Sequence, residues 1–414
     1  MEWWVLVAVA ATLVLIVARP YGFGEAWAAA SGAAAMLLLG AVGPGDVWSV
    51  ARETSEVLGF LLGMMVLTWL VERAGVFDRL GEAVALSARR SGRLLFVLVF
   101  LLGAVVTALL SLDVTVLVLT PIVYALATRR RLDALPFMFA CTFVANTGSL
   151  LLPISNLTNL LVYSQLGLGF TAFVGRMWLP SVAAVATNLG VFLWLFRHRL
   201  PDRFDDAAEE ALPAVDWWFR AAGTVLALTM LGLFAAGLAH RPLAWPALVG
   251  AGVLLVVGVV GKRVRPRQTI ESVSPALFVF VVGMFLVVRG FERTWLGLLD
   301  IHLPGQPLPA LLLAVVGNAV GSNIVNNVPM SLLSLSLIAQ TDGPIREVLA
   351  YGTLVGANIG PALTTYGSLA TMLWLTLIRK RGIDLSTAEY LKVAAVTVPA
   401  VLVAATLALW LGLR

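Results

Sequence analysis

Long apolar segments, separated by short polar or arginine-rich stretches, fill this chain of 414 residues. A helix that crosses a bilayer needs about 20 mostly apolar residues, and twelve segments reach or approach that length. Six of them cover 3–18, 26–42, 54–71, 94–127, 134–168 and 171–197. The other six cover 217–238, 243–260, 274–290, 306–340, 345–380 and 389–412. We therefore predict an all-α polytopic membrane protein.

One polar linker divides these segments into two sets of six. Residues 198–216 are rich in Arg, Asp and Glu, which leaves a first unit at 1–197 and a second at 217–414. Polar positions recur in the two units: Asn146 aligns with Asn358 at an offset of 212. The match of Ala104-Val105-Val106 with Ala314-Val315-Val316 has an offset of 210 and places Asp113 against Asn323. Six segments in each unit predict an internal repeat.

Positive charge orients the two units in the membrane. Arginine and lysine gather at 73–93, 129–131, 197–199, 262–267 and 379–381, which we expect to be cytoplasmic, as is the linker. The segment 94–127 then begins and ends inside, which predicts a re-entrant hairpin with its tip at 110–115. The segment 306–340 begins and ends outside, with its tip at 322–327. The two repeats thus have inverted topology, with about ten full spans and both termini external.

Composition narrows the function. With 60% hydrophobic and 12% charged residues and a mean hydropathy of +0.94, the chain has no room for a soluble catalytic domain. Cys141 is the only cysteine, which excludes a multi-cysteine metal site, and no clustered His or paired acids suggest an enzyme or a cofactor. The net charge of +5 does not indicate nucleic-acid binding, because the arginines lie in short loops between apolar segments.

Polar residues interrupt four of the segments: the two hairpin tips, and 134–168 and 345–380, which we expect to be broken helices. Broken backbone at membrane depth must be buried in protein or face a water-filled cavity, and paired breaks in two repeats indicate a transporter's midplane site. The candidate substrate-binding residues are Asn146, Thr147, Ser149, Ser155, Asn156, Asn323, Asn326, Asn327, Asn358, Thr364, Thr365 and Ser368. The alternative is that these groups only join helices.

Asp113 is the acid that lies deepest in any apolar segment. An ionisable residue within a membrane segment is a functional candidate by default. Such a carboxyl group can bind and release a proton as its surroundings change, which predicts proton coupling. The alternative is a structural carboxylate that caps a half-helix of the hairpin.

An ordered series of motifs along nearly the whole chain resembles the bacterial arsenite and antimonite efflux permeases (arsenical pump membrane proteins) of the ion transporter superfamily. The motifs are Gly92–Phe96, Leu119–Val123, Ser155–Asn159, Gly167–Thr171, Asn326–Pro329 and Gly367–Trp374. The resemblance implies secondary export of arsenite and antimonite in exchange for protons across the prokaryotic inner membrane, with a possible cytosolic ATPase partner. It also implies two hairpins and two broken helices around the substrate.

This chain departs from the family where some relatives carry charge. It has Asn146 in the first break, and Asn358 and Ala362 in the second, where some relatives have acids and a lysine. Asp113 is then the main candidate proton carrier. Amides and hydroxyls without arginine suit neutral arsenous acid better than a dianion. A dicarboxylate or other anion carrier and a sodium/proton antiporter are the alternatives.

Overall fold

The computed structural model describes residues 2–18, 24–204, 215–296 and 303–413, so the middle of the predicted linker, 205–214, lies outside the described residues. The described part of the first unit is helical. Its elements are α1 (Glu2–Ala18), α2 (Glu25–Leu38), α3 (Pro44–Arg73), α4 (Val76–Ser87), α5 (Gly92–Leu109), α6 (Leu112–Val114), η2 (Thr115–Leu119), α7 (Thr120–Arg129), α8 (Ala134–Gly148), η3 (Pro153–Ser155), α9 (Leu157–Gln165) and α10 (Phe170–Leu195).

The described part of the second unit is helical as well. Its elements are α11 (Trp217–Leu238), α12 (Ala244–Val260), α13 (Pro266–Ser272), α14 (Pro275–Phe291), η4 (Glu292–Leu296), α15 (Pro307–Val325), α16 (Asn327–Ile338), α17 (Gly343–Ile359), η5 (Gly360–Leu363), α18 (Leu369–Lys380) and α19 (Thr387–Leu413). Each apolar segment of the sequence therefore corresponds to one helix or to a pair of helices separated by a break.

Eight stretches of the described chain are long and apolar enough to cross a membrane. They are Pro44–Arg73, Gly92–Leu109, Leu112–Arg129, Phe170–Leu195, Trp217–Leu238, Pro275–Trp295, Pro307–Val325 and Thr387–Leu413. Shorter apolar helices lie at Trp3–Ile16, Ala134–Gly148, Ala244–Val260 and Asn327–Ile338. Many large apolar side chains on these helices are exposed, as the surface of a bilayer protein requires. The protein is a multi-pass membrane protein.

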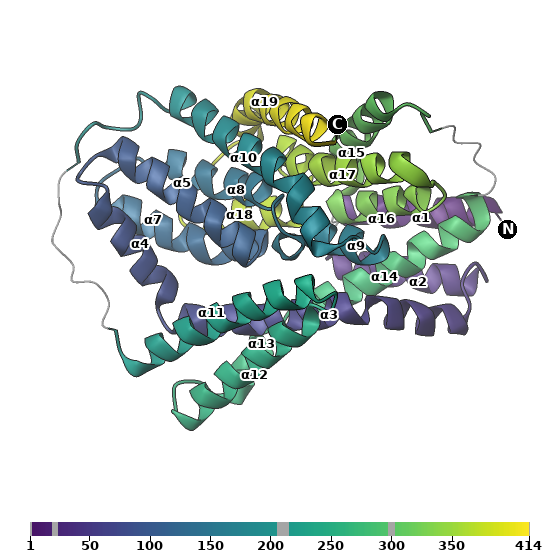
Figure 1. Cartoon of the computed structure of the whole chain (residues 1–414), viewed down its shortest axis with the longest axis horizontal. Coiled ribbons are helices and arrows are strands. Elements are labelled where there is room, and N and C mark those ends of the chain that lie inside the picture. Colours follow the sequence, from purple (N-terminus) through teal and green to yellow (C-terminus); the bar gives the residue numbers. More distant parts are fainter. Residues whose placement is uncertain (1, 19–23, 205–214, 297–302, 414) are drawn as a thin grey trace.

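Helices of each unit pack on helices of the other. Helix α2 packs on α14, and α12 packs on α3. These helices form, with α1 and α11, the α3–α14 group. The pair α10 and α19 packs together on the far side of the molecule, and α8, α9, α16, α17 and α18 lie between (Figure 1). The four breaks are therefore held inside the bundle, facing the α3–α14 group.

Two helices and one extension were not expected from hydropathy. Helices α4 and α13 lie in the arginine-rich connections, and α3 begins at Pro44, ten residues before the apolar segment starts. Proline suits this first position because it lacks the N–H that a helix start leaves unbonded. The Asp46 carboxylate also accepts the Gly43 N–H at 2.8 Å, which caps the helix. Local start signals, and not apolar length, set this boundary.

Candidate functional site

Each of the four breaks ends where a new helix starts behind a polar capping residue. Ser111 accepts the Val114 N–H at 3.3 Å, and Asn156 accepts the Thr158 N–H at 3.2 Å. In the second unit, the caps are Asn326, which accepts the Val328 N–H at 3.5 Å, and Ser368, which accepts the Thr371 N–H at 3.2 Å. These are the residue types that helix N-termini prefer, because their short side chains reach the free N–H groups of the first turn.

A cavity of about 400 Å³ joins the four helix starts. It is lined by residues of all of them: Ser111–Val114, Asn156–Leu157, Asn327–Val328 and Ser368–Leu369. Its opposite wall comes from α2, α3 and α14. Asp113, Asn156, Asn327 and Ser368 are the predicted site residues that line this cavity. Four polar breaks far apart in the sequence thus meet in one space.

Asp113 and Asn327 offer polar side-chain groups that the described part of the chain leaves without partners. The Asp113 carboxylate is half-buried and makes no hydrogen bond or ion pair with the described residues. The Asn327 side chain is only 4% exposed, and its amide likewise has no described partner. The helix after the first break is capped by Ser111 and not by Asp113. The hydrogen-bonding capacity of both side chains is therefore available to a bound solute.

Asn358 holds the two broken helices together. Its Oδ1 accepts hydrogen bonds from Ser149 Oγ and from Asn156 Nδ2, each at 2.6 Å. Its Nδ2 donates to Asn159 Oδ1 at 2.7 Å and to Leu354 O at 2.7 Å. All of these groups are buried. The Asn358 amide is thus fully used within the protein and does not line the cavity.

Other candidate residues close the breaks against their neighbours. Asn323 Oδ1 accepts from Thr364 N at 3.0 Å and from Thr364 Oγ1 at 2.7 Å, and Asn323 Nδ2 donates to Gly360 O at 2.7 Å. Ser155 Oγ donates to Ala108 O at 2.7 Å, which joins the first break to α5. These contacts satisfy the backbone groups that a broken helix leaves free.

The remaining candidates do not line the cavity. Asn146 Nδ2 donates to Thr142 O at 2.9 Å within α8, and Thr147 Oγ1 accepts from Asn188 Nδ2 at 3.1 Å. Asn326 Nδ2 is 3.5 Å from Tyr366 O, and half-buried Thr365 lies in the turn after η5. Their polar groups serve mainly helix contacts in this conformation.

Comparisons with known proteins show the family of this chain. A family model described as "Citrate transporter" matches residues 13–353. The arsenical pump membrane protein of Escherichia coli K12 is 32% identical over 92% of both chains, and that of Yersinia enterocolitica is 31% identical over 92% of both. This chain belongs to the arsenical pump membrane protein family. It is therefore a membrane transporter and not an enzyme, as predicted.

The fold resembles a solved transporter structure. The YdaH transporter of Alcanivorax borkumensis, described as having an unusual topology, matches with a TM-score of 0.59 over 99% of this chain and 97% of that chain. The two sequences are 16% identical, so this likeness concerns the fold alone. It confirms the predicted all-α polytopic class for this family member.

The alignment of the two hairpins at an offset of 210 is wrong. The capping residues at the two breaks are Ser111 and Asn326, which differ by 215. Asp113 therefore corresponds to Val328 and not to Asn323, and the acid has no polar counterpart in the second hairpin. The shared Ala-Val-Val letters misled because such triplets are common in apolar helices, whereas the caps mark the actual helix starts.

The cavity wall contributed by α3 and α14 was not predicted. On α3 the lining residues recur at helical spacing, from Phe60 through Met64 and Thr68 to Glu72. Phe280 of α14 faces the same space. These residues are mostly apolar and lie in helices without breaks, so they resemble ordinary core positions. The sequence offered one weak signal, the polar residue Thr68 inside an apolar segment. In the structure its buried hydroxyl has no described hydrogen-bond partner.

Proposed function

We propose that this transporter exports trivalent arsenite and antimonite from the cytoplasm in exchange for protons. The observation that carries this proposal is the charge of the cavity. Among the described residues that line it are three acids, Glu25, Glu72 and Asp113, and no Lys, Arg or His. A multiply charged anion would enter the cavity without a cationic side chain to pair with it, and burying its charge would be costly. A neutral solute such as arsenous acid does not carry this cost.

Neutral arsenous acid can exchange its water hydrogen bonds for those of the site. It presents hydroxyl groups that both donate and accept, and an unmatched polar group costs about 1 to 3 kcal/mol when buried. The Asn327 amide offers a donor and an acceptor, and the Asp113 carboxylate offers an acceptor. Ser111 and Ser368 line the same cavity. These groups support binding of a small neutral polyhydroxy solute.

Asp113 is the proposed proton carrier. A carboxyl group in a solute cavity can be protonated from one side and deprotonated to the other as the cavity changes access. Exchange of one proton for a neutral solute moves net charge, and each 100 mV of membrane potential then supplies about 2.3 kcal/mol. At about 1.4 kcal/mol per tenfold ratio, this sustains a solute gradient of roughly fortyfold.

The membrane arrangement is part of the proposal. We expect the α5–α7 and α15–α16 pairs to be re-entrant hairpins of inverted repeats that enter from opposite faces of the prokaryotic inner membrane, with both termini external. The exchange of packing partners between α2 and α12 supports this pseudo-twofold relation. The arginine-rich connections would face the cytoplasm, where family resemblance suggests docking of an ATPase. Labelling of cysteines placed at 93 and 129 tests the first hairpin, because both positions should label from one side.

A citrate-like anion is the second candidate substrate. The matching family model carries that description, and the four helix starts each bring roughly half a positive charge toward the cavity. These dipoles favour an anion, but the lining carboxyl groups of Glu72 and Asp113 oppose a trianion. A neutral solute is therefore the better fit.

Transport into liposomes under an imposed pH gradient separates these substrates. Arsenite, antimonite, sodium, succinate and citrate are presented one at a time to purified protein. We expect accumulation of arsenite and antimonite that depends on the gradient and is abolished by a protonophore. Accumulation of citrate or succinate without arsenite would replace the proposal with an anion carrier. Movement of sodium alone would indicate a sodium/proton antiporter.

A further inference from the structure

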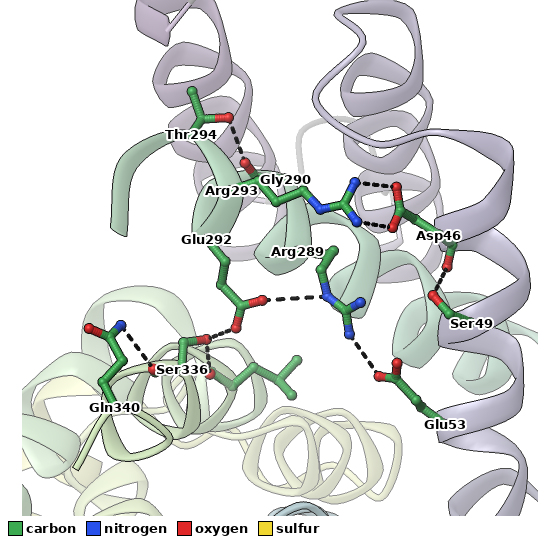
Figure 2. A network of polar contacts seen from close by, with 11 residues as sticks. Asp46, Ser49, Glu53, Arg289, Gly290, Glu292, Arg293, Thr294, Ser336 and Gln340 are labelled. Carbon is green, nitrogen blue, oxygen red and sulfur yellow. Dashed lines mark hydrogen bonds and ion pairs between the residues drawn. The ribbon is translucent and has the colours of Figure 1, made fainter. Parts of the chain in front are cut away.

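A network of charged side chains joins one end of α3 to one end of α14. The two terminal nitrogens of Arg293 lie 2.6 and 2.5 Å from the two carboxylate oxygens of Asp46. Arg289 pairs with Glu53 at 2.7 Å and with Glu292 at 3.5 Å (Figure 2). All five side chains belong to α3, α14 or η4, so these pairs lie within the α3–α14 group.

Glu292 extends this network to a helix outside the group. Its carboxylate accepts a hydrogen bond from the hydroxyl of Ser336, which is buried on α16 (Figure 2). The same helix begins at Asn327, which lines the cavity. Nine residues separate the two, or about 14 Å along a helix at about 1.5 Å per residue. One rigid helix therefore connects the solute cavity to the charged network.

The network and the cavity mouth lie at opposite ends of the same helices. On α3 the network uses Asp46 and Glu53, and the cavity extends to Glu72, about 39 Å from Asp46 at about 1.5 Å per residue. On α14 the network uses Arg289, and the cavity is lined by residues at the start of the helix. Lining residues are buried at Phe60 and exposed at Glu72, so the cavity opens toward the Glu72 end.

We propose that the Glu292–Ser336 contact is a latch that closes the protein on the face opposite the cavity mouth. The ion pair with Arg289 holds the Glu292 carboxylate in place, and the Arg293–Asp46 pair ties the same turn to α3. Ser336 docks on this carboxylate when α16 is in the position seen here. When the cavity changes access, α16 leaves this position and the contact breaks. A single charge-assisted hydrogen bond suits this role, because it biases one conformation without preventing the other.

This inference rests on transport by alternating access and not on the identity of the solute. The first experiment therefore measures conformation without substrate, in a Cys141→Ala background. Leu373 lines the cavity and is exposed, so Leu373→Cys reports access to the mouth through its rate of maleimide labelling. Ser336→Ala and Glu292→Gln should lower this rate, because a loss of about 1 kcal/mol from the mouth-open state lowers its ratio to the mouth-closed state about fivefold.

Two variants serve as controls for this labelling experiment. Ser336→Thr keeps a hydroxyl and should restore the rate, which a general loss of folding would not allow. Glu271→Gln removes an exposed pair with Arg267 and should leave the rate unchanged. An unchanged rate in both Ser336→Ala and Glu292→Gln would overturn the latch.

Cross-linking tests the movement directly. The pair Glu292→Cys and Ser336→Cys, in the same Cys141→Ala background, is oxidised in liposomes and then reduced. A disulfide should form and should stop transport of whichever solute the protein carries. Reduction of the disulfide should restore transport. Failure to form the disulfide would refute the contact, and full transport by the cross-linked protein would refute its opening during the cycle.

Discussion

Replacing Asn358 by alanine should destabilise the protein more than it affects solute affinity. The side chain makes hydrogen bonds to three other side chains, Ser149, Asn156 and Asn159, and all are buried. At about 0.6 kcal/mol for each such bond in a membrane protein, Asn358→Ala costs about 2 kcal/mol. The cost rises if water cannot reach the partners, since an unmatched buried polar group costs about 1 to 3 kcal/mol.

The chain contains its own probe for this measurement. Cys141 is buried and is the only cysteine, so a thiol-reactive fluorogenic dye in detergent reports unfolding as this residue becomes exposed. Asn146→Ala is the matched control, because the Asn146 amide makes one described hydrogen bond, to Thr142 O. We expect a clear fall in unfolding temperature for Asn358→Ala and a smaller one for Asn146→Ala. An unchanged unfolding temperature with a raised transport KM for Asn358→Ala would refute this structural role.

Three further substitutions test the solute site, the role of the thiol and the packing at a break. Asn327→Ala should raise the transport KM about tenfold, equal to about 1.4 kcal/mol, with an unchanged unfolding temperature; an unchanged KM would move the solute elsewhere. Cys141→Ala should transport arsenite at the normal rate, and loss of transport in well-folded protein would make the thiol a ligand. Gly360→Ala should cost about 1 to 3 kcal/mol by overpacking, because its Cβ would lie 2.3 Å from Ala319 Cα. Gly317→Ala should not destabilise the protein, because its Cβ would have no neighbour within 4 Å. Equal unfolding temperatures for Gly360→Ala and Gly317→Ala would contradict the close packing at Gly360.

Much of the fold follows from local features of the sequence. Apolar length locates the helices, and polar caps such as Ser111 and Asn156 mark where helices restart after a break. The depth of Asp113 in an apolar segment makes it a functional candidate, and the structure places it in the cavity wall. The helices and their breaks follow from the sequence because membrane burial constrains backbone hydrogen bonding so strongly that each break must have a polar explanation.

The sequence could not show which polar residues line the cavity and which hold helices together. Asn327 and Asn358 both follow apolar stretches at breaks, yet one lines the cavity and the other is bonded on every side. The difference depends on partners about 200 residues away in the chain, since Asn358 contacts Asn156 and Asn159. The wall from Phe60 to Glu72 was missed for the same reason: facing a cavity leaves no pattern different from facing a neighbouring helix.

In the proposed transport cycle, Asp113 couples proton entry to solute export. The most direct measurement compares wild-type protein with Asp113→Asn in liposomes, with arsenite transport driven either by a pH gradient or by arsenite's own gradient. Asparagine keeps the shape and much of the hydrogen-bonding capacity of aspartate but does not titrate. We expect Asp113→Asn to lose all accumulation driven by the pH gradient and to retain part of the downhill exchange. Concentration of arsenite against its gradient by the Asp113→Asn variant would contradict this coupling role.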